Sequence, residues 1–208
     1  MVKIHRLKGD ITPEISGSFK NSIAIDTEAT GLQIPERDKL SLIQICSDNS
    51  EVYIIQPDRK TYRAPNLVKL LENKNILKIG HFFRFDKNAL EFFLKCKIKN
   101  IFDTKIASKV VRTYTDQHGL KNLVYEFCNK NLDKRQGSSD WNKDINELTE
   151  KQLEYAAGDV IYLHKIKKEL EKMLVREKRM GLFQNCIAFL NTRVELDQKG
   201  FKEDIFEH

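Results

Sequence analysis

The stretch that decides the fold is NSIAIDTEATG, residues 21–31. Its apolar run at 23–25 predicts a buried β-strand, and Gly31 ends the pattern. Asp26 and Glu28 stand two positions apart, so the two-residue period of a strand places both side chains on one face of the sheet. Neighbouring carboxylates repel each other, and a divalent cation with a preference for oxygen ligands would relieve that repulsion. The alternative is a turn, because Asp-Thr-Glu before a glycine is also turn chemistry.

The sequence that follows this strand predicts more of the same sheet. Residues 41–47 (SLIQICS) alternate apolar and polar side chains, and residues 51–55 (EVYII) form a second short β-type run. The Asp-Asn-Ser turn at 48–50 predicts a hairpin between them, with strand 21–28 as a neighbour of this hairpin. Two further strands are expected at 76–80 and at 98–102.

Helices dominate the second half of the chain. Pro65 suits the first turn of a helix, Asp103 or Thr104 can cap another, and Thr149 with Gln152 forms a capping-box pattern. The polar stretch 131–142 predicts a loop. The expected helices cover 65–71, 85–94, 104–112, 120–127, 149–179 and a last segment after Gly181. These patterns indicate an α/β fold: a mixed central β-sheet flanked by α-helices, with a helical C-terminal part.

The long helix expected from Thr149 carries a second candidate pair, Tyr155 and Asp159. Their spacing of four residues places both on one helical face, which is otherwise apolar. An unpaired carboxylate there is costly, so Asp159 should meet a cation or a counter-charge. The alternative is a pair that bonds to backbone groups of the core. Gly158, unfavourable inside a helix, predicts a close approach of another backbone, for which the strand of Asp26 is the candidate.

Asp86 is a third candidate, in the first turn of the helix expected after residues 81–85. The helix dipole favours an acidic side chain at that position in any protein. Taken singly, Asp86 therefore carries no functional signal.

The order of these motifs is more specific than any one of them. D-x-E followed by T-G-L, a later acid at a helix start, and Y-x-x-x-D on a C-terminal helix together resemble the DEDDy 3′→5′ exonucleases of the ribonuclease D family, which have a ribonuclease-H-like fold. The stretches FDTKIASKVVRTYTDQHGL, QGSSDW and QLEYAAGDVIYLH resemble its short, single-domain relatives of the nanoRNase C, oligoribonuclease-like type. The resemblance implies one exonuclease domain over 1–208, with a core over about 1–180 and a helical extension over about 181–208.

The same resemblance implies a mechanism and a cofactor. Two divalent cations, Mg²⁺ or Mn²⁺, would activate a water and stabilise the leaving oxygen of a phosphodiester, with nucleoside 5′-monophosphates as products. By resemblance the metal ligands are Asp26, Glu28, Asp86 and Asp159, with Tyr155 as the fifth catalytic residue. Tyr155 should orient the water through its hydroxyl, since a phenol with a pKa near 10 is a poor base at neutral pH.

Several other residues are expected to hold the substrate. Leu32 matches the position at which relatives insert a leucine between the two terminal bases, although an ordinary core leucine is the alternative. Trp141 and the phenylalanines at 82, 83 and 85 could stack on bases, and at least two of the four are expected to be core residues. Phe82 departs from the polar residue that many relatives have there. The expected substrate-binding residues are Thr27, Leu32, His81, Phe82, Arg84, Gln136, Ser138 and Ser139.

Composition is consistent with this interpretation, but by itself it does not indicate a function. The chain has 208 residues with 40% hydrophobic and 32% charged side chains, and a formal net charge of +6 suits an acidic partner such as RNA. The four cysteines are not within metal-ligand spacing of one another, and the N-terminus has no secretory signal, so a cytoplasmic protein without a membrane partner is expected. By resemblance the chain forms a homo-oligomer, with a ring as the expected form.

Three functions stay open on sequence grounds. The first is an exoribonuclease for short single-stranded RNA, dinucleotides included. The second is a broader ribonuclease D-like exonuclease that trims structured RNA 3′ ends or degrades DNA. The third is a non-catalytic RNA-binding module on this fold, against which the presence of all five motif residues argues.

Overall fold

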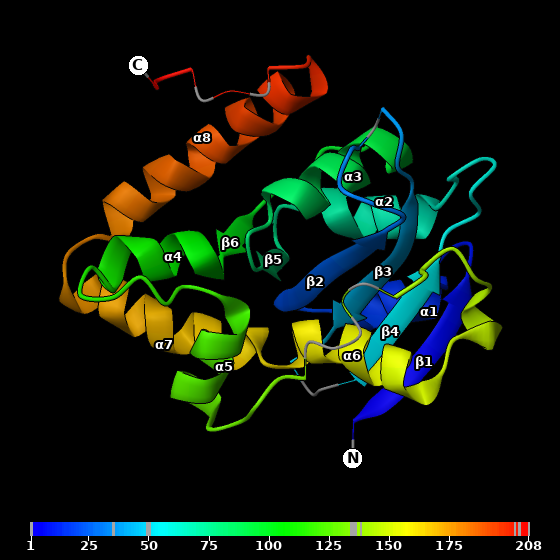
Figure 1. Cartoon of the computed structure of the whole chain (residues 1–208), viewed down its shortest axis with the longest axis horizontal. Helices are drawn as coiled ribbons and strands as arrows, with labels where there is room; N and C mark the ends of the chain where they lie inside the picture. Colours follow the sequence, from blue (N-terminus) through cyan, green and yellow to red (C-terminus); the bar gives the residue numbers. More distant parts are fainter. Residues whose placement is uncertain are drawn as a thin grey trace.

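A mixed six-stranded sheet forms the centre of the computed structural model, which describes residues 2–34, 36–48, 51–133, 137, 139–201, 203 and 205–207 (Figure 1). The strands are β1 (Lys3–Lys8), β2 (Ser22–Ala29), β3 (Leu40–Cys46), β4 (Glu51–Gln56), β5 (Leu77–Gly80) and β6 (Ile101–Asp103). The helices are α1 (Pro13–Ser18), α2 (Pro65–Glu72), α3 (Arg84–Leu94), α4 (Thr104–Val111), α5 (Leu120–Cys128), the 3₁₀ turn η1 (Ile145–Glu147), α6 (Glu150–Ile161), α7 (Leu163–Arg176) and α8 (Met180–Gln198).

The strand order is β1-β4-β3-β2-β5-β6, so β2 lies inside the sheet. It runs antiparallel to β3 and parallel to β5, and β3 pairs with β4 as the predicted hairpin. Register places Asp26 opposite Gln44 and Glu28 opposite Leu42. Pairing with β5 holds the start of β2, and pairing with β3 extends through the D-x-E motif, which fixes the direction of its side chains.

Helices cover both faces of this sheet, and each face has its own apolar core. On one face Ile25 and Ile43 pack in a core with side chains of α2, α3 and α8. On the other face Ala24 and Leu42 pack in a core with α4, α5, α6 and α7. Figure 1 shows α6 in yellow against the central strands, and α6 contacts β2, β3 and β4. The α/β architecture with a mixed sheet and a helical C-terminal part is confirmed.

Local sequence explains where several helices begin. Pro65 is the first residue of α2, where its missing N–H leaves no hydrogen bond unmade. The Thr149 side chain accepts from the Gln152 N–H while the Gln152 side chain binds back to the Thr149 N–H, which confirms the capping box at the start of α6. Asp103 caps α4 by accepting from the N–H groups of Lys105 and Ile106.

The structure also corrects the predicted elements. Neither β1 nor α1 was predicted: β1 is a charged edge strand without a buried residue, and α1 has only six residues, with Gly17 among them. The helix expected over 149–179 is two helices that meet at Tyr162, and α7 ends at Arg176. The strand expected at 98–102 is β6, which begins at Ile101. Among the described residues, no helix is both long and apolar enough to cross a bilayer.

Candidate active site

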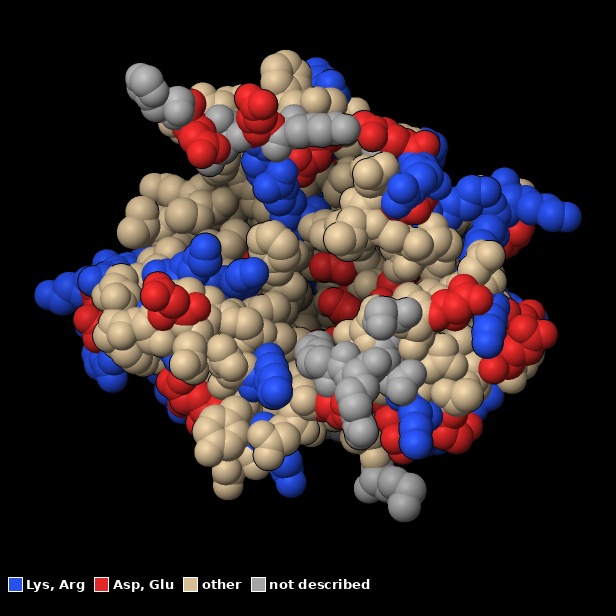
Figure 2. All heavy atoms as spheres, viewed as in Figure 1, with Lys and Arg blue, Asp and Glu red and all other residues tan. Residues whose placement is uncertain are grey.

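Three carboxylates, two from β2 and one from α6, meet where this helix packs on the strand. Asp26 and Glu28 come from the strand and Asp159 from α6, and one oxygen of each lies within 4.8 Å of the others. Asp159 is only 6% exposed, and its helix neighbours Ala156 and Val160 are fully buried. Figure 2 shows acidic side chains on the floor of a hollow in this face of the molecule. We call Asp26, Glu28 and Asp159 the three-carboxylate group.

This group has the chemistry of a site for a hard divalent cation. Three anionic oxygens at such a short separation raise one another's energy, and the low dielectric around Asp159 increases the repulsion. Mg²⁺ and Mn²⁺ prefer carboxylate oxygens and would offset that energy. The residues present therefore fit a divalent metal, and the turn alternative for the D-x-E motif is wrong, since both residues lie within β2.

Tyr155 lies one helical turn before Asp159 on α6 and is half-buried. Burial raises the pKa of its hydroxyl above the usual range, and the charges of Asp159, Glu28 and Asp26 raise that pKa further. The indole of Trp141, which is 4% exposed, lies against the phenol ring with 6.0 Å between ring centroids. Tyr155 therefore stays protonated at neutral pH, in a fixed orientation, and can donate a hydrogen bond beside the three-carboxylate group.

Asp86 joins the site through Thr27. The Thr27 hydroxyl donates to Asp86 Oδ1 at 2.6 Å, and both residues are buried. Strand alternation turns Thr27 away from the face that carries Asp26 and Glu28. The structure thus brings Asp86 to the D-x-E motif by way of Thr27, and does not include it in the three-carboxylate group. Burial raises the pKa of Asp86 to about 7 against the opposing effect of the Thr27 hydrogen bond.

The raised pKa of Asp86 predicts how the metal-free protein responds to pH. Below a pH of about 7 the folded chain binds a proton at Asp86 that the unfolded chain, with a carboxyl pKa near 3.8, releases. Stability from this group is therefore fully present below the unfolded pKa and is lost as the pH rises through the folded pKa of about 7. We expect the melting temperature of the wild type relative to Asp86→Asn, both in EDTA, to fall as the pH rises from about 4 to about 7 and to level off above that. Parallel melting profiles for the two proteins would contradict this assignment.

The turn between β5 and α3, residues 81–83, leads into the helix that carries Asp86, and Asp103 fixes the shape of this turn. The Asp103 carboxylate accepts from the N–H groups of Phe82 at 3.2 Å and Phe83 at 2.7 Å, while also capping α4. A Cβ at Gly80 would lie 2.3 Å from the Phe83 ring, so only glycine fits there. The sequence indicated Asp103 as a cap. Its hydrogen bonds to the turn before α3 depend on the β5–β6 pairing, which no local pattern shows.

Two of the expected substrate residues sit on this turn. His81 Nδ1 lies 2.9 Å from the Thr104 hydroxyl, which donates to the Gly80 carbonyl, so His81 Nδ1 carries the proton. Phe82 has a φ of 58° and a side chain that is 51% exposed, with the Lys105 ammonium 3.9 Å from its ring centroid. The Phe82 ring is exposed, and its backbone is held in a strained conformation in the turn before α3. This ring is available for stacking on a base.

The loop after β2 presents Leu32 to solvent. Leu32 is 84% exposed, which rules out the core alternative. The buried Asp38 carboxylate accepts from the Gln33 N–H at 2.8 Å and binds the Arg37 guanidinium. A Cβ at Gly31 would lie 2.4 Å from that carboxylate, so glycine is required for the close approach. Asp38 was not singled out from the sequence, because an acid in a loop has many uses.

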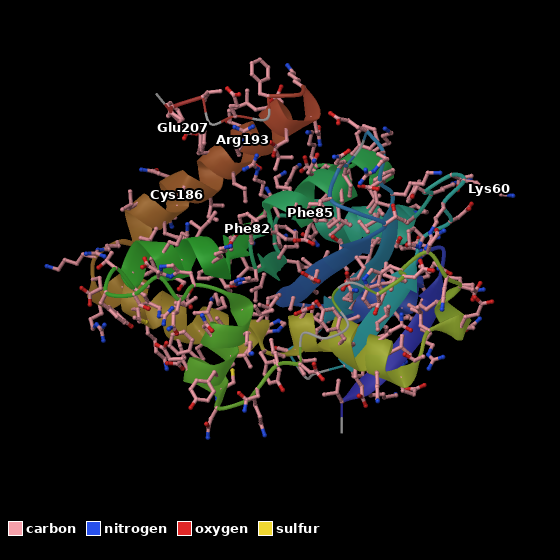
Figure 3. All side chains as sticks on the ribbon, viewed as in Figure 1. Lys60, Phe82, Phe85, Cys186, Arg193 and Glu207 are labelled. Atoms are coloured by element: carbon pink, nitrogen blue, oxygen red, sulfur yellow. The ribbon has the colours of Figure 1, made fainter. Side chains whose placement is uncertain are left out.

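Arg84 and Ser139 are the remaining expected substrate-binding residues within the described part of the chain. Arg84 makes two hydrogen bonds to Asp197, at 2.7 and 2.6 Å, and so ties α3 to α8. Figure 3 shows Phe82 and Phe85 on one side of this junction and Arg193 on α8 opposite them. Ser139 is half-buried in the loop before η1. Gln136 and Ser138 lie outside the described residues. Phe83 and Trp141 are core residues, which confirms that at least two of the four aromatics are.

A cavity of about 490 Å³ lies beside the face of α6 that carries Tyr155 and Asp159. Tyr155, Gly158 and Asp159 line it from the helix, and Asn131 and Leu132 line it from the loop after α5. A Cβ at Gly158 would lie 3.5 Å from Leu132, which is an ordinary contact. The prediction that Gly158 lets the strand of Asp26 approach is therefore wrong: the helix faces the loop at that position, and glycine is not required for space.

The comparisons with known proteins agree with this geometry. The sequence profile of the 3′–5′ exonuclease family matches residues 13–175. The chain belongs to this family. A ribonuclease D from Jannaschia sp. is 31% identical over 157 residues, 73% of this chain and 39% of that protein. The chain thus spans about two-fifths of the length of that relative.

Solved structures of the family extend the comparison to the fold. Brucella melitensis NrnC bound to pGG is 42% identical, with a TM-score of 0.92 and full coverage of both chains. NrnC with bound Mg²⁺ is 42% identical over 99% of both chains, with a TM-score of 0.90. Escherichia coli RNase D shares the fold at 24% identity and a TM-score of 0.75, covering 87% of this chain and 46% of that one. The ribonuclease-D-type exonuclease fold and family are thereby confirmed.

Proposed function

We propose that this exonuclease-family chain is a metal-dependent 3′→5′ exoribonuclease that removes nucleoside 5′-monophosphates from short single-stranded RNA, dinucleotides included. The observation that carries the proposal is the three-carboxylate group, with a protonated tyrosine beside it. The substrate class is supported by the likeness to NrnC, which has been solved with pGG, a dinucleotide.

Asp26, Glu28 and Asp159 would hold the metal, with Asp86 acting from the Thr27 side. When bound, two Mg²⁺ or Mn²⁺ ions supply a nucleophilic water and neutralise charge on the leaving oxygen. The water oxygen bonds to phosphorus, the bond from phosphorus to O3′ of the preceding nucleotide breaks, and that oxygen takes up a proton. The products are a nucleoside 5′-monophosphate and an RNA shorter by one residue with a free 3′ hydroxyl.

The chain's own groups supply orientation. The Tyr155 hydroxyl stays protonated because of its raised pKa, so it can donate to or position the attacking water but cannot act as the base. Leu32 stands on a loop braced by Asp38, and an exposed apolar side chain there can insert between two terminal bases. His81, Phe82 and Ser139 are proposed to contact the sugar-phosphate chain or the bases. A substrate gripped in this way needs only two nucleotides, which favours short RNA.

Graded substrate length is the experiment that tests this proposal. We expect 5′-labelled RNA dinucleotides to be turned over faster than an RNA of about 20 nucleotides, which is longer than ordinary single-stranded binding sites. EDTA should abolish both reactions, and matched DNA should be cleaved more slowly. Equal rates on both lengths, or faster cleavage of DNA, would favour the broader ribonuclease D-like activity. Binding of RNA without any cleavage would favour the non-catalytic module. Assembly into a homo-oligomer stays a prediction, which light scattering can test.

A further inference from the structure

A buried amide on β3 has no hydrogen-bond partner among the described residues. The Gln44 side chain is 0% exposed, and neither its Nε2 nor its Oε1 makes a hydrogen bond. A buried polar group in that condition lowers the stability of the fold, whereas an apolar side chain of the same shape would not. A native amide left in this state therefore calls for an explanation other than stability.

The position of Gln44 in the sheet supplies an explanation for its buried amide. It lies directly opposite Asp26 in the antiparallel β2–β3 ladder, so both side chains project from the same face of the sheet. Opposite residues in such a ladder have Cβ atoms about 5 Å apart, within reach of each other's side chains. Its neighbours on the same face of the strand, Leu42 and Cys46, are fully buried and belong to the apolar core. Gln44 is thus the polar position in an apolar row, and it is the position beside Asp26.

Helix α6, which packs over this row of side chains, further narrows the choice of hydrogen-bond partner for Gln44. α6 packs on β2, β3 and β4 and carries Asp159 on its buried side. Gln44 Nε2 has two hydrogens to donate, and carboxylate oxygens keep lone pairs for such donors even while they bind a metal. In metal sites, groups behind the ligands fix the orientation of those ligands by such hydrogen bonds.

We propose that Gln44 is a positioning residue of the metal centre, whose Nε2 donates a hydrogen bond to the Asp26 carboxylate when that carboxylate holds a divalent cation. The inference rests on the metal centre of the proposed function and adds a residue to it. In the metal-free protein the amide is unsatisfied, and metal binding supplies its partner. The chain thus gives up some metal-free stability in exchange for a ligand with a fixed direction.

Gln44→Met tests this, because methionine has a similar shape without the amide. In EDTA the variant should melt at the same temperature as the wild type or about 2–4 °C higher, since a buried unsatisfied group is removed. Its affinity for Mn²⁺, measured by calorimetry, should fall about 10-fold, as expected when the support of a metal ligand is lost. Leu42→Met is the matched control: it is fully buried on the same face of the strand, opposite Glu28, and should bind Mn²⁺ like the wild type.

Two results would overturn the proposal. An unchanged Mn²⁺ affinity in Gln44→Met would show that the amide does not act on the metal ligands. A lower metal-free melting temperature than that of the wild type would show that the amide already has a stabilising partner. Neither Mn²⁺ affinity nor the metal-free melting temperature depends on RNA hydrolysis. If the wild type bound Mn²⁺ but cleaved no RNA, the proposed function would be refuted, and the two measurements on Gln44→Met would still test the role of Gln44.

Discussion

Asp26→Asn should lower kcat for RNA hydrolysis by about 10³-fold, the equivalent of roughly 4 kcal/mol of transition-state stabilisation. Asparagine keeps the shape of the side chain but removes the charge that we assign to the metal. The same change removes one of three mutually repelling carboxylates, so the metal-free melting temperature should stay equal or rise. Single-turnover hydrolysis of a short RNA with saturating Mg²⁺ measures the first effect, and thermal melting in EDTA measures the second.

Glu195→Gln is the control for this variant, since it makes the same change of charge on α8. The Glu195 side chain is 62% exposed and forms an ion pair with Lys199. Its kcat should match that of the wild type. Wild-type turnover by Asp26→Asn with Mg²⁺ or Mn²⁺ would refute the metal mechanism. A loss of turnover together with a lower melting temperature would instead point to damage to β2.

Tyr155→Phe should lower kcat by about 10²-fold while leaving the affinity for Mn²⁺ within a small factor of the wild type. The phenylalanine keeps the ring against Trp141 and removes only the hydroxyl, which we propose orients the attacking water. Misplacement of a reacting group by about 1 Å costs a factor of this size. The pKa of Tyr155 is raised, so the tyrosine stays protonated across neutral pH and would act on the water only by hydrogen bonding. The loss of kcat in Tyr155→Phe should therefore be constant across that pH range.

Tyr125→Phe provides the comparison, because it removes a hydroxyl from a tyrosine that is 61% exposed on α5. It should leave kcat and KM unchanged. If Tyr155→Phe raised KM at constant kcat, the hydroxyl would be a substrate-binding group and not a catalytic one. If it weakened Mn²⁺ binding as strongly as kcat, its role would be to hold Asp159.

Patterns with a short period were sufficient to predict most of the fold and to place the members of each candidate pair on one face of a strand or helix. The run before Asp26 shows a buried strand, and the spacing from Tyr155 to Asp159 shows one face of a helix, because both depend only on neighbours along the chain. The edge strand β1 escaped prediction because its side chains are charged and none is buried. The break at Tyr162 escaped because the apolar stripe continues across it.

Contacts between distant segments could not be predicted in the same way. Thr27 meets Asp86 across 59 positions, and Asp103 grips the turn at Phe82 and Phe83 from about 20 positions away. Asp38 and Gln44 looked like an ordinary loop acid and an ordinary strand residue, since their importance lies in what surrounds them. Burial without a partner becomes visible only when all the neighbours of Gln44 are in place.

The separation of the three carboxylates along the chain has a consequence for biosynthesis. Asp26 and Glu28 belong to an early strand, and Asp159 to a helix that follows more than a hundred residues later. While a ribosome is still adding α6, the emerging polypeptide has two of the three acids and no enclosed place for a cation. Any ability to cut RNA would therefore begin only after α6 has left the exit tunnel and docked on the sheet. A partly made chain could not attack the message from which it is being translated.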